Sequence, residues 1–155
     1  MTPPQPPRIW WIDEGRVAGS PNPTEDELKA LRAEGFAAIV CLIEDEEEHT
    51  YRRAAAEALG YRCYGIPIRD HGAPTSAQFD AVLRILEAEC RRGKVLVHCQ
   101  GGSGRTGTLG AAYLVARGAG VDAAITKLRE ARPAAVETDA QLRSLRRWAQ
   151  SRGAQ

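Results

Sequence analysis

The sequence predicts one α/β domain, with a mostly parallel, mixed central sheet of about four to five strands flanked by helices. From residue 24 onward, stretches with helical apolar spacing alternate with short apolar runs that have the length of buried strands. This alternation is typical of a parallel sheet covered by helices on both faces. The chain of 155 residues has no internal repeat and is long enough for one hydrophobic core, so a single domain is expected.

The N-terminal stretch divides into a tail and the start of the sheet. Residues 1–7 are rich in proline and are expected to be extended or disordered, whereas residues 8–152 are expected to form the folded domain. A short strand is predicted over residues 9–12, which include Trp10 and Trp11. For these two large side chains, packing in the core is favoured over a recognition patch.

The next elements alternate regularly. A turn and a second short strand are predicted over residues 15–21, followed by a helix over 24–35 that opens with a capping box and ends at a glycine. A buried strand over 37–43 precedes a helix over 44–59, which begins with five acidic residues. A solvated first helical turn explains these acids better than metal binding does, because carboxylates stabilise helix N-termini. Another strand follows over 61–66.

The second half of the chain begins with an irregular loop over residues 67–74. A helix over 75–93 leads to a buried strand over 95–97, and two more helices are expected over 121–131 and 138–151. In α/β sheets the site lies beyond the carboxyl ends of the strands. We therefore expect the loops at 43–44, 67–74 and 99–105 to meet at one edge.

One of these loops carries an unusual combination of residues. A cysteine, three glycines, an arginine and a threonine follow the 95–97 strand and precede a helical pattern. A strand that turns into a helix in this way directs backbone N–H groups and the positive end of a helix dipole into one small space, which suits an anion. The expected phosphate-binding residues are Gln100, Gly101, Gly102, Ser103, Gly104 and Arg105.

Each side chain of this loop has a chemical rationale. Cys99 is a nucleophile as a thiolate, which the N–H donors at the helix start would stabilise. Arg105 offers a planar fork that holds two phosphate oxygens together. Thr106 is placed to donate its hydroxyl to the sulfur, and His98 to hold the shape of the loop. A structural cysteine beside a glycine-rich turn is the simpler alternative, and the compatible spacing of all these residues argues against it.

The stretch resembles the H-C-x-x-G-x-x-R-[ST] signature of the cysteine-dependent protein tyrosine phosphatase superfamily, and Gly104 and Gly107 resemble its small atypical dual-specificity branch. The resemblance covers about residues 10–150 and implies a mixed sheet flanked by helices, with residues 8–152 as a catalytic domain. It also implies hydrolysis of phosphotyrosine, extending to phosphoserine and phosphothreonine, through a phosphocysteine. Neither a cofactor nor a metal is implied.

A leaving alkoxide needs a proton donor, and Asp70 is the favoured candidate. It lies on the 67–74 loop, which should open at the same edge of the sheet as Cys99, and this loop also resembles the general-acid loop of the family. Capping of a turn is the alternative for Asp70. His71 is the second candidate acid, although a solvated loop histidine is its favoured interpretation.

The resemblance assigns roles to three further residues. The stretch from Glu137 to Gln141 resembles the last motif of the family, which positions the hydrolytic water; helix capping is the structural alternative, and both can hold. Cys41 corresponds to a "backdoor" cysteine that forms a reversible disulfide with the oxidised nucleophile, and a core position is an equal alternative. The remaining cysteines, Cys63 and Cys90, are expected in the core.

Composition narrows the partners and the location. A formal charge of +1 gives no argument for nucleic acid, and no apolar run approaches the length of a membrane span. Residues 1–7 lack the features of a signal peptide, so a cytoplasmic location is expected. The protein is also expected to be a monomer, without a membrane anchor or a nucleic-acid partner. The expected partner is a phosphorylated protein or peptide. A phosphoinositide or other small phosphate ester, a non-catalytic phosphate-binding module and a sulfurtransferase stay as alternatives.

Overall fold

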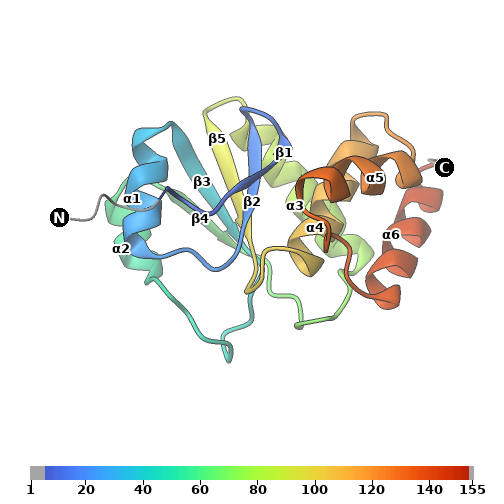
Figure 1. Ribbon diagram of the computed structural model, residues 1–155, viewed down its shortest axis with the longest axis horizontal. Helices are drawn as coiled ribbons and strands as arrows, with labels where there is room; N and C mark the ends of the chain where they lie inside the picture. The colour runs from blue at the N-terminus through green and yellow to red at the C-terminus, as the bar shows by residue number, and fades with distance from the viewer. Residues whose placement is uncertain (1–5, 154–155) are drawn as a thin grey trace.

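The computed structural model describes residues 6–153 and confirms the predicted α/β domain, so most of the predicted proline-rich tail lies outside the described residues. A sheet in the order β1-β2-β5-β3-β4 forms its centre (Figure 1). Four of its strands are parallel, and only β1 is antiparallel, to β2. The strands are β1 (Trp10–Asp13), β2 (Val17–Ser20), β3 (Phe36–Cys41), β4 (Arg62–Gly65) and β5 (Lys94–His98).

The helices form a layer on each face of the sheet. In Figure 1 α1 and α2 cover one face, while α3 and α4 cover the other and α5 and α6 pack outside α4. No helix within residues 6–153 is both long and apolar enough to cross a membrane. The helices are α1 (Glu25–Ala33), α2 (Arg53–Ala58), α3 (Ser76–Glu89), α4 (Gly104–Ala116), α5 (Val121–Ala131) and α6 (Asp139–Ser151).

Three helices begin with complete capping boxes, and the sequence indicated two of them, those of α1 and α6. The threonine at each N-cap accepts a hydrogen bond from the backbone N–H three residues later, and the Glu or Gln there accepts one from the backbone N–H of the threonine. Each box satisfies two helix-end donors, and loss of the threonine hydroxyl typically costs about 1 kcal/mol. The caps are Thr24, Thr75 and Thr138.

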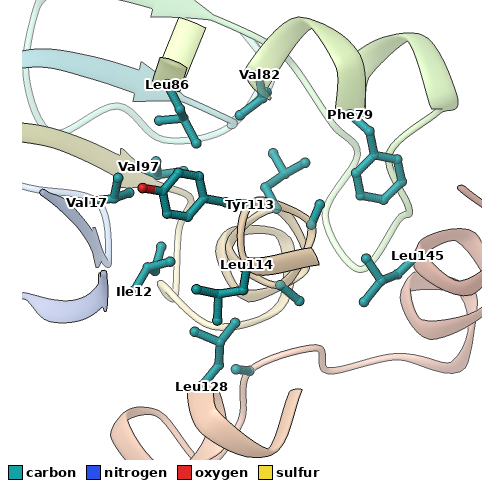
Figure 2. Packing of buried hydrophobic residues seen from close by; sticks show 14 of the residues in the cluster. Ile12, Val17, Phe79, Val82, Leu86, Val97, Tyr113, Leu114, Leu128 and Leu145 are labelled. Atoms are coloured by element: carbon teal, nitrogen blue, oxygen red, sulfur yellow. The ribbon is translucent and has the colours of Figure 1, made fainter. Parts of the chain in front are cut away.

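The larger part of the core lies between the sheet and the α3–α6 layer. Figure 2 shows Ile12, Val17 and Val97 from the sheet facing Tyr113 and Leu114 of α4, with side chains of α3, α5 and α6 around them. Helix α4 is therefore buried along nearly its whole length. A fully buried side chain of this size contributes roughly 1.5–3 kcal/mol, so this packing fixes the position of the loop from which α4 starts.

The two N-terminal tryptophans pack inward, as favoured from the sequence. Trp10 is buried, and its indole Nε1 donates a hydrogen bond to the Gly102 carbonyl at 2.9 Å. Trp11 is half-buried and stacks on Phe36, with ring centroids 5.9 Å apart. Trp10 therefore links the first strand to the glycine-rich loop.

The predicted helix over 44–59 is wrong in its first half, because α2 begins only at Arg53. Residues 44–47 form a single turn, in which the Glu47 N–H donates to the Glu44 carbonyl at 3.1 Å. The turn does not continue, since the Glu48 carbonyl accepts hydrogen bonds from the side chains of Asn22 and Gln100. Tertiary contacts thus replace the helical hydrogen bonds that the acidic run favours locally.

Candidate active site

Cys99 directly follows β5, the central strand, at the carboxyl edge of the sheet. Its side chain is buried, and the Thr106 hydroxyl donates a hydrogen bond to its sulfur over 3.1 Å. This is the contact expected between these two residues from the sequence. A hydroxyl donor at this distance stabilises negative charge on the sulfur, both before attack and when the sulfur acts as a leaving group.

The segment from Cys99 to Arg105, here called the signature loop, depends on glycine at one position in particular. Gly102 has φ +76°, and a Cβ there would lie 2.4–2.8 Å from backbone atoms of Ser20 and Pro21. The loop then enters α4 at Gly104, without a side-chain cap at Ser103. The N–H groups of a first helical turn have no acceptors within the helix, so they are available to an anion.

Arg105 is held in place by both neighbouring loops. Its side chain is 1% exposed, and its Nη1 and Nη2 atoms lie 2.7 and 2.9 Å from the two oxygens of Glu47. Nη1 also donates to the Ile68 carbonyl at 2.8 Å, and Nη2 lies 3.2 Å from Oδ1 of Asp70. The predicted meeting of the three loops at one edge is thus confirmed.

Glu47 is a member of the site that the sequence analysis missed. The Arg105 guanidinium lowers the pKa of the Glu47 carboxyl below its usual range, despite the opposing effect of burial. Burial alone would lower the pKa of Arg105, but the carboxylate and the nearby Cys99 outweigh it and raise that pKa. The pair therefore stays charged, and the acidic run was the only signal of it in the sequence.

Asp70 and His71 lie at the open side of the site. The Asp70 side chain is 53% exposed, and His71 has φ +62°, a conformation that histidine adopts more readily than most residues. The two ring nitrogens of His71 face different carboxylates, with Nε2 3.7 Å from Asp70 and Nδ1 3.4 Å from Glu137. The structure thus places Asp70, rather than His71, against Arg105.

Gln141 and Glu137 reach the site from the start of α6. The Gln141 side chain is buried, its Oε1 accepts from the backbone N–H groups of Glu137 and Thr138, and its Nε2 donates to the Gly72 carbonyl at 3.1 Å. All three contacts are with backbone, so Gln141 connects α6 to the Asp70 loop. Glu137 is exposed, and a Cβ added to Gly104 would lie 3.0 Å from its Oε1.

His98 anchors the loop from the opposite face of the sheet. It is buried, its Nε2 forms a hydrogen bond of 2.7 Å with the Tyr51 hydroxyl, and its Nδ1 lies 3.4 Å from the Cys99 carbonyl. Burial lowers the pKa of His98 to about 4, so the ring is neutral at pH 7. These contacts fit the loop-holding role expected for His98.

Cys41 lies in β3, level with His98 in the strand register. Cys41 is packed against the core cluster to which Cys99 belongs. Its thiol is half-buried, and burial raises its pKa. The disulfide between Cys41 and Cys99 stays a prediction.

Arg132, which the sequence analysis also missed, braces the signature loop from the end of α5. Its Nε donates to the Ser103 hydroxyl at 2.9 Å, and its Nη2 donates to the Gly101 carbonyl at 2.7 Å. Together with Trp10, it occupies carbonyl groups of the loop and leaves the N–H groups free for a ligand. Within residues 6–153, no cluster of three or more His, Cys, Asp or Glu side chains could hold a metal ion.

Comparison with known proteins identifies consistent relatives. The family model described as "Swiss Army Knife protein, DSP-PTPase phosphatase domain" matches residues 6–152. Protein tyrosine phosphatase domain-containing protein 1 of Mus musculus is 34% identical over 109 residues, which cover 70% of this chain and 15% of that protein. The chain thus spans about a sixth of the length of the curated relatives it matches.

Two solved structures extend the comparison. The structure of Tk-PTP in the active form is 40% identical, covers 93% of this chain and 97% of that one, and superposes with a TM-score of 0.86. The structure of PTPMT1 in complex with PI(5)P is 18% identical, covers 94% of this chain and 99% of that one, and gives a TM-score of 0.81. At that identity the second likeness shows the fold alone.

Proposed function

This chain belongs to the family of DSP-PTPase phosphatase domains, and from that premise we propose that it hydrolyses phosphotyrosine, and also phosphoserine and phosphothreonine, in proteins through a phosphocysteine at Cys99. Membership makes it a phosphatase of the cysteine-based protein tyrosine phosphatase family. One arrangement carries the proposal. Cys99 and Arg105 frame the start of a buried helix, the Thr106 hydroxyl points to the sulfur, and Asp70 lies beside the arginine.

In the first step, the Cys99 thiolate attacks phosphorus and the bond between phosphorus and the ester oxygen breaks. The electron pair of that bond leaves with the oxygen, which takes a proton from Asp70. Arg105 and the N–H groups of the signature loop hold the equatorial oxygens, most tightly in the trigonal-bipyramidal transition state. This step yields the free alcohol or phenol and a phosphocysteine.

In the second step, water attacks the phosphocysteine, Asp70 accepts its proton, and the sulfur leaves as a thiolate. The Thr106 hydroxyl, 3.1 Å from the sulfur, assists this departure. Glu137 and Gln141 both approach Gly104 at the start of α4, so either side chain is placed to orient the water. The Gln141 amide uses one of its two N–H donors to support the Asp70 loop through the Gly72 carbonyl.

The hydrogen bonds of Arg105 define how it would receive a phosphate. Both Nη1 protons are engaged, by Glu47 and the Ile68 carbonyl, and one Nη2 proton faces Glu47. The second Nη2 proton faces Asp70 at the longer distance of 3.2 Å. Nε and Nη2 therefore form the edge that binds phosphate, and the substrate displaces Asp70 from the arginine, which moves this carboxyl towards the leaving oxygen.

The charge around the site supports a protein substrate over a polyanionic lipid headgroup. Arg105 is the only basic residue within the signature loop, and Arg132 contacts the loop from outside. The acidic run at 44–48, with five carboxylates, is bonded to the loop through Gln100 and Arg105. The negative charges of this acidic run would repel a headgroup that carries several phosphates. The PI(5)P of the PTPMT1 complex is a ligand of that protein, and a phosphoinositide or small phosphate ester stays as the alternative substrate for this chain.

Turnover of phosphotyrosine and phosphothreonine peptides and of phosphoinositide vesicles, in the presence of EDTA, tests the proposal. We expect peptide hydrolysis, fastest with phosphotyrosine, and its complete loss in Cys99→Ser, which should still bind phosphate. Undiminished activity of that variant would overturn the mechanism. Hydrolysis of the lipid alone would replace the protein substrate, and phosphate binding without any turnover would favour a binding module.

A further inference from the structure

A hollow of the described surface lies at the end of the sheet opposite the signature loop. It has a volume of about 820 Å³ and is bordered by α3 from Asp80 onward, the last turn of α4, the turn before β2, and the residue that follows α6. Cys90 and Arg91 border it just before β5 begins, whereas Cys99 follows the end of that strand. Five strand residues span roughly 16 Å, so this hollow is separate from the catalytic centre.

Basic side chains dominate this distal cavity. It is lined by five arginines and only two carboxylates, those of Asp80 and Glu87. The whole chain carries a formal charge of only +1, so the excess of three positive charges here is a local feature. The arginines come from segments far apart in sequence and are Arg16, Arg84, Arg91, Arg117 and Arg152.

Few of these guanidinium groups are firmly paired. Arg16 and Arg117 share the carboxylate of Asp13 at 3.7 and 3.9 Å, and Arg91 lies 3.6 Å from Glu87. Arg84 takes part in none of the ion pairs found within residues 6–153. Contacts of such length between exposed groups are weak, so these arginines keep most of their capacity to bind an anion.

Three side chains that line the cavity are fixed by contacts with neighbouring groups. Asp80 accepts a hydrogen bond from the Trp148 indole at 3.1 Å, which ties this carboxylate to the core. The Arg152 guanidinium lies over the same indole, 4.9 Å from the ring centroid, so its edge stays available for hydrogen bonds. Tyr113 donates its hydroxyl to Asp13 at 2.6 Å and so fixes the acid between two arginines.

We propose that this distal cavity is a second anion site, which binds a soluble small molecule carrying two or more clustered phosphate groups. The volume is typical of small-molecule sites. The planar guanidinium forks among its lining residues match phosphate oxygens, which they bind in bidentate fashion. A single phosphate would engage only part of this set, so clustered phosphates fit the arrangement best.

Titration of the 15N-labelled protein with inorganic tripolyphosphate, followed by amide chemical shifts, tests the proposal. We expect one saturating set of shifts around residues 83–91 and 113–117, and a separate set in the signature loop. The double variant Arg84→Ala/Arg117→Ala should weaken only the first set, by at least about tenfold, because each lost charged hydrogen bond is worth roughly a factor of ten. Retained shifts in the loop show that the variant is folded.

Two further variants sharpen the result. Glu87→Gln removes a lining carboxylate and releases Arg91, so tripolyphosphate should bind the cavity about two- to fivefold more tightly. Arg147→Ala, which removes one positive charge of α6 outside the lining, should change nothing. Absence of shifts at the cavity, or equal shifts in the double variant, would overturn the proposal. Shifts only with phosphoinositide vesicles would replace the soluble ligand by a lipid headgroup.

Discussion

Two segments bring a carboxylate to Arg105, and they hold it in opposite ways. Residues 44–52 are bonded to the signature loop by Glu47 and by the Glu48 carbonyl, and to His98 just before the loop by Tyr51. The Glu47 side chain is only 17% exposed. The 67–74 loop offers Asp70, which is 53% exposed and touches the arginine once, at 3.2 Å. The tightly held acid is suited to fixing the arginine, and the loosely held acid to exchanging protons with the substrate.

The sharpest test of this contrast is Asp70→Asn. We expect kcat for a phosphopeptide to fall by about 10²–10³, because the leaving oxygen loses its proton donor. An aryl phosphate with an acidic phenol needs little protonation and should lose much less. His71→Asn is the matched control from the same loop and should retain most activity. Equal losses for both leaving groups in Asp70→Asn would contradict the assignment of Asp70 as the acid.

The 44–52 segment is held by the hydrogen bond between Tyr51 and the buried His98, and this histidine makes the free energy of unfolding depend on pH. The pKa of His98 is about 4 in the folded protein and about 6.5 when unfolded, so the unfolded chain binds more protons between these values. Stability is therefore full above pH 6.5 and falls towards pH 4, by up to about 3 kcal/mol. Urea unfolding at pH 7 and pH 4.5 should show this loss, and His98→Gln should lack it. If the free energy of unfolding of His98→Gln fell between pH 7 and pH 4.5 as much as that of the wild type, the loss would belong to other groups.

The smallest expected effect belongs to Glu47→Gln, which keeps a hydrogen-bond acceptor and removes the charge. We expect kcat/KM to fall by about tenfold for both leaving groups alike, because a less ordered arginine affects all substrates. Asp45→Asn changes an exposed acid of the same run and should have no such effect. An equal loss in that control would mean that the acidic run acts through its overall charge, without a specific role for Glu47.

The contrast also separates what the sequence reveals from what it hides. The nucleophile loop, the three threonine caps and the inward tryptophans follow local patterns of spacing and residue type, and the structure contains them. Glu47 was hidden because acidic residues before an alanine-rich stretch look like a helix N-terminus. Only its contact with Arg105, 58 residues away, distinguishes the two cases.

Long-range contacts explain the other omissions as well. Arg132 reaches the signature loop from 29 and 31 residues away, and its local sequence indicates only the end of a helix before a proline. The arginines of the distal cavity are single charges on separate elements, which the fold alone gathers. No single segment of the sequence determines the order of the strands in the sheet, which brings such residues together.

That order has a consequence for how the protein is made. The fifth strand in sequence is the middle strand in space, and β2 and β3 bond to it but not to each other. A nascent chain that has emerged only as far as β4 can therefore form two separate strand pairs but no continuous sheet. Cys99 directly follows β5, the strand that joins the two pairs, so the nucleophile is synthesised only when the chain can complete its sheet.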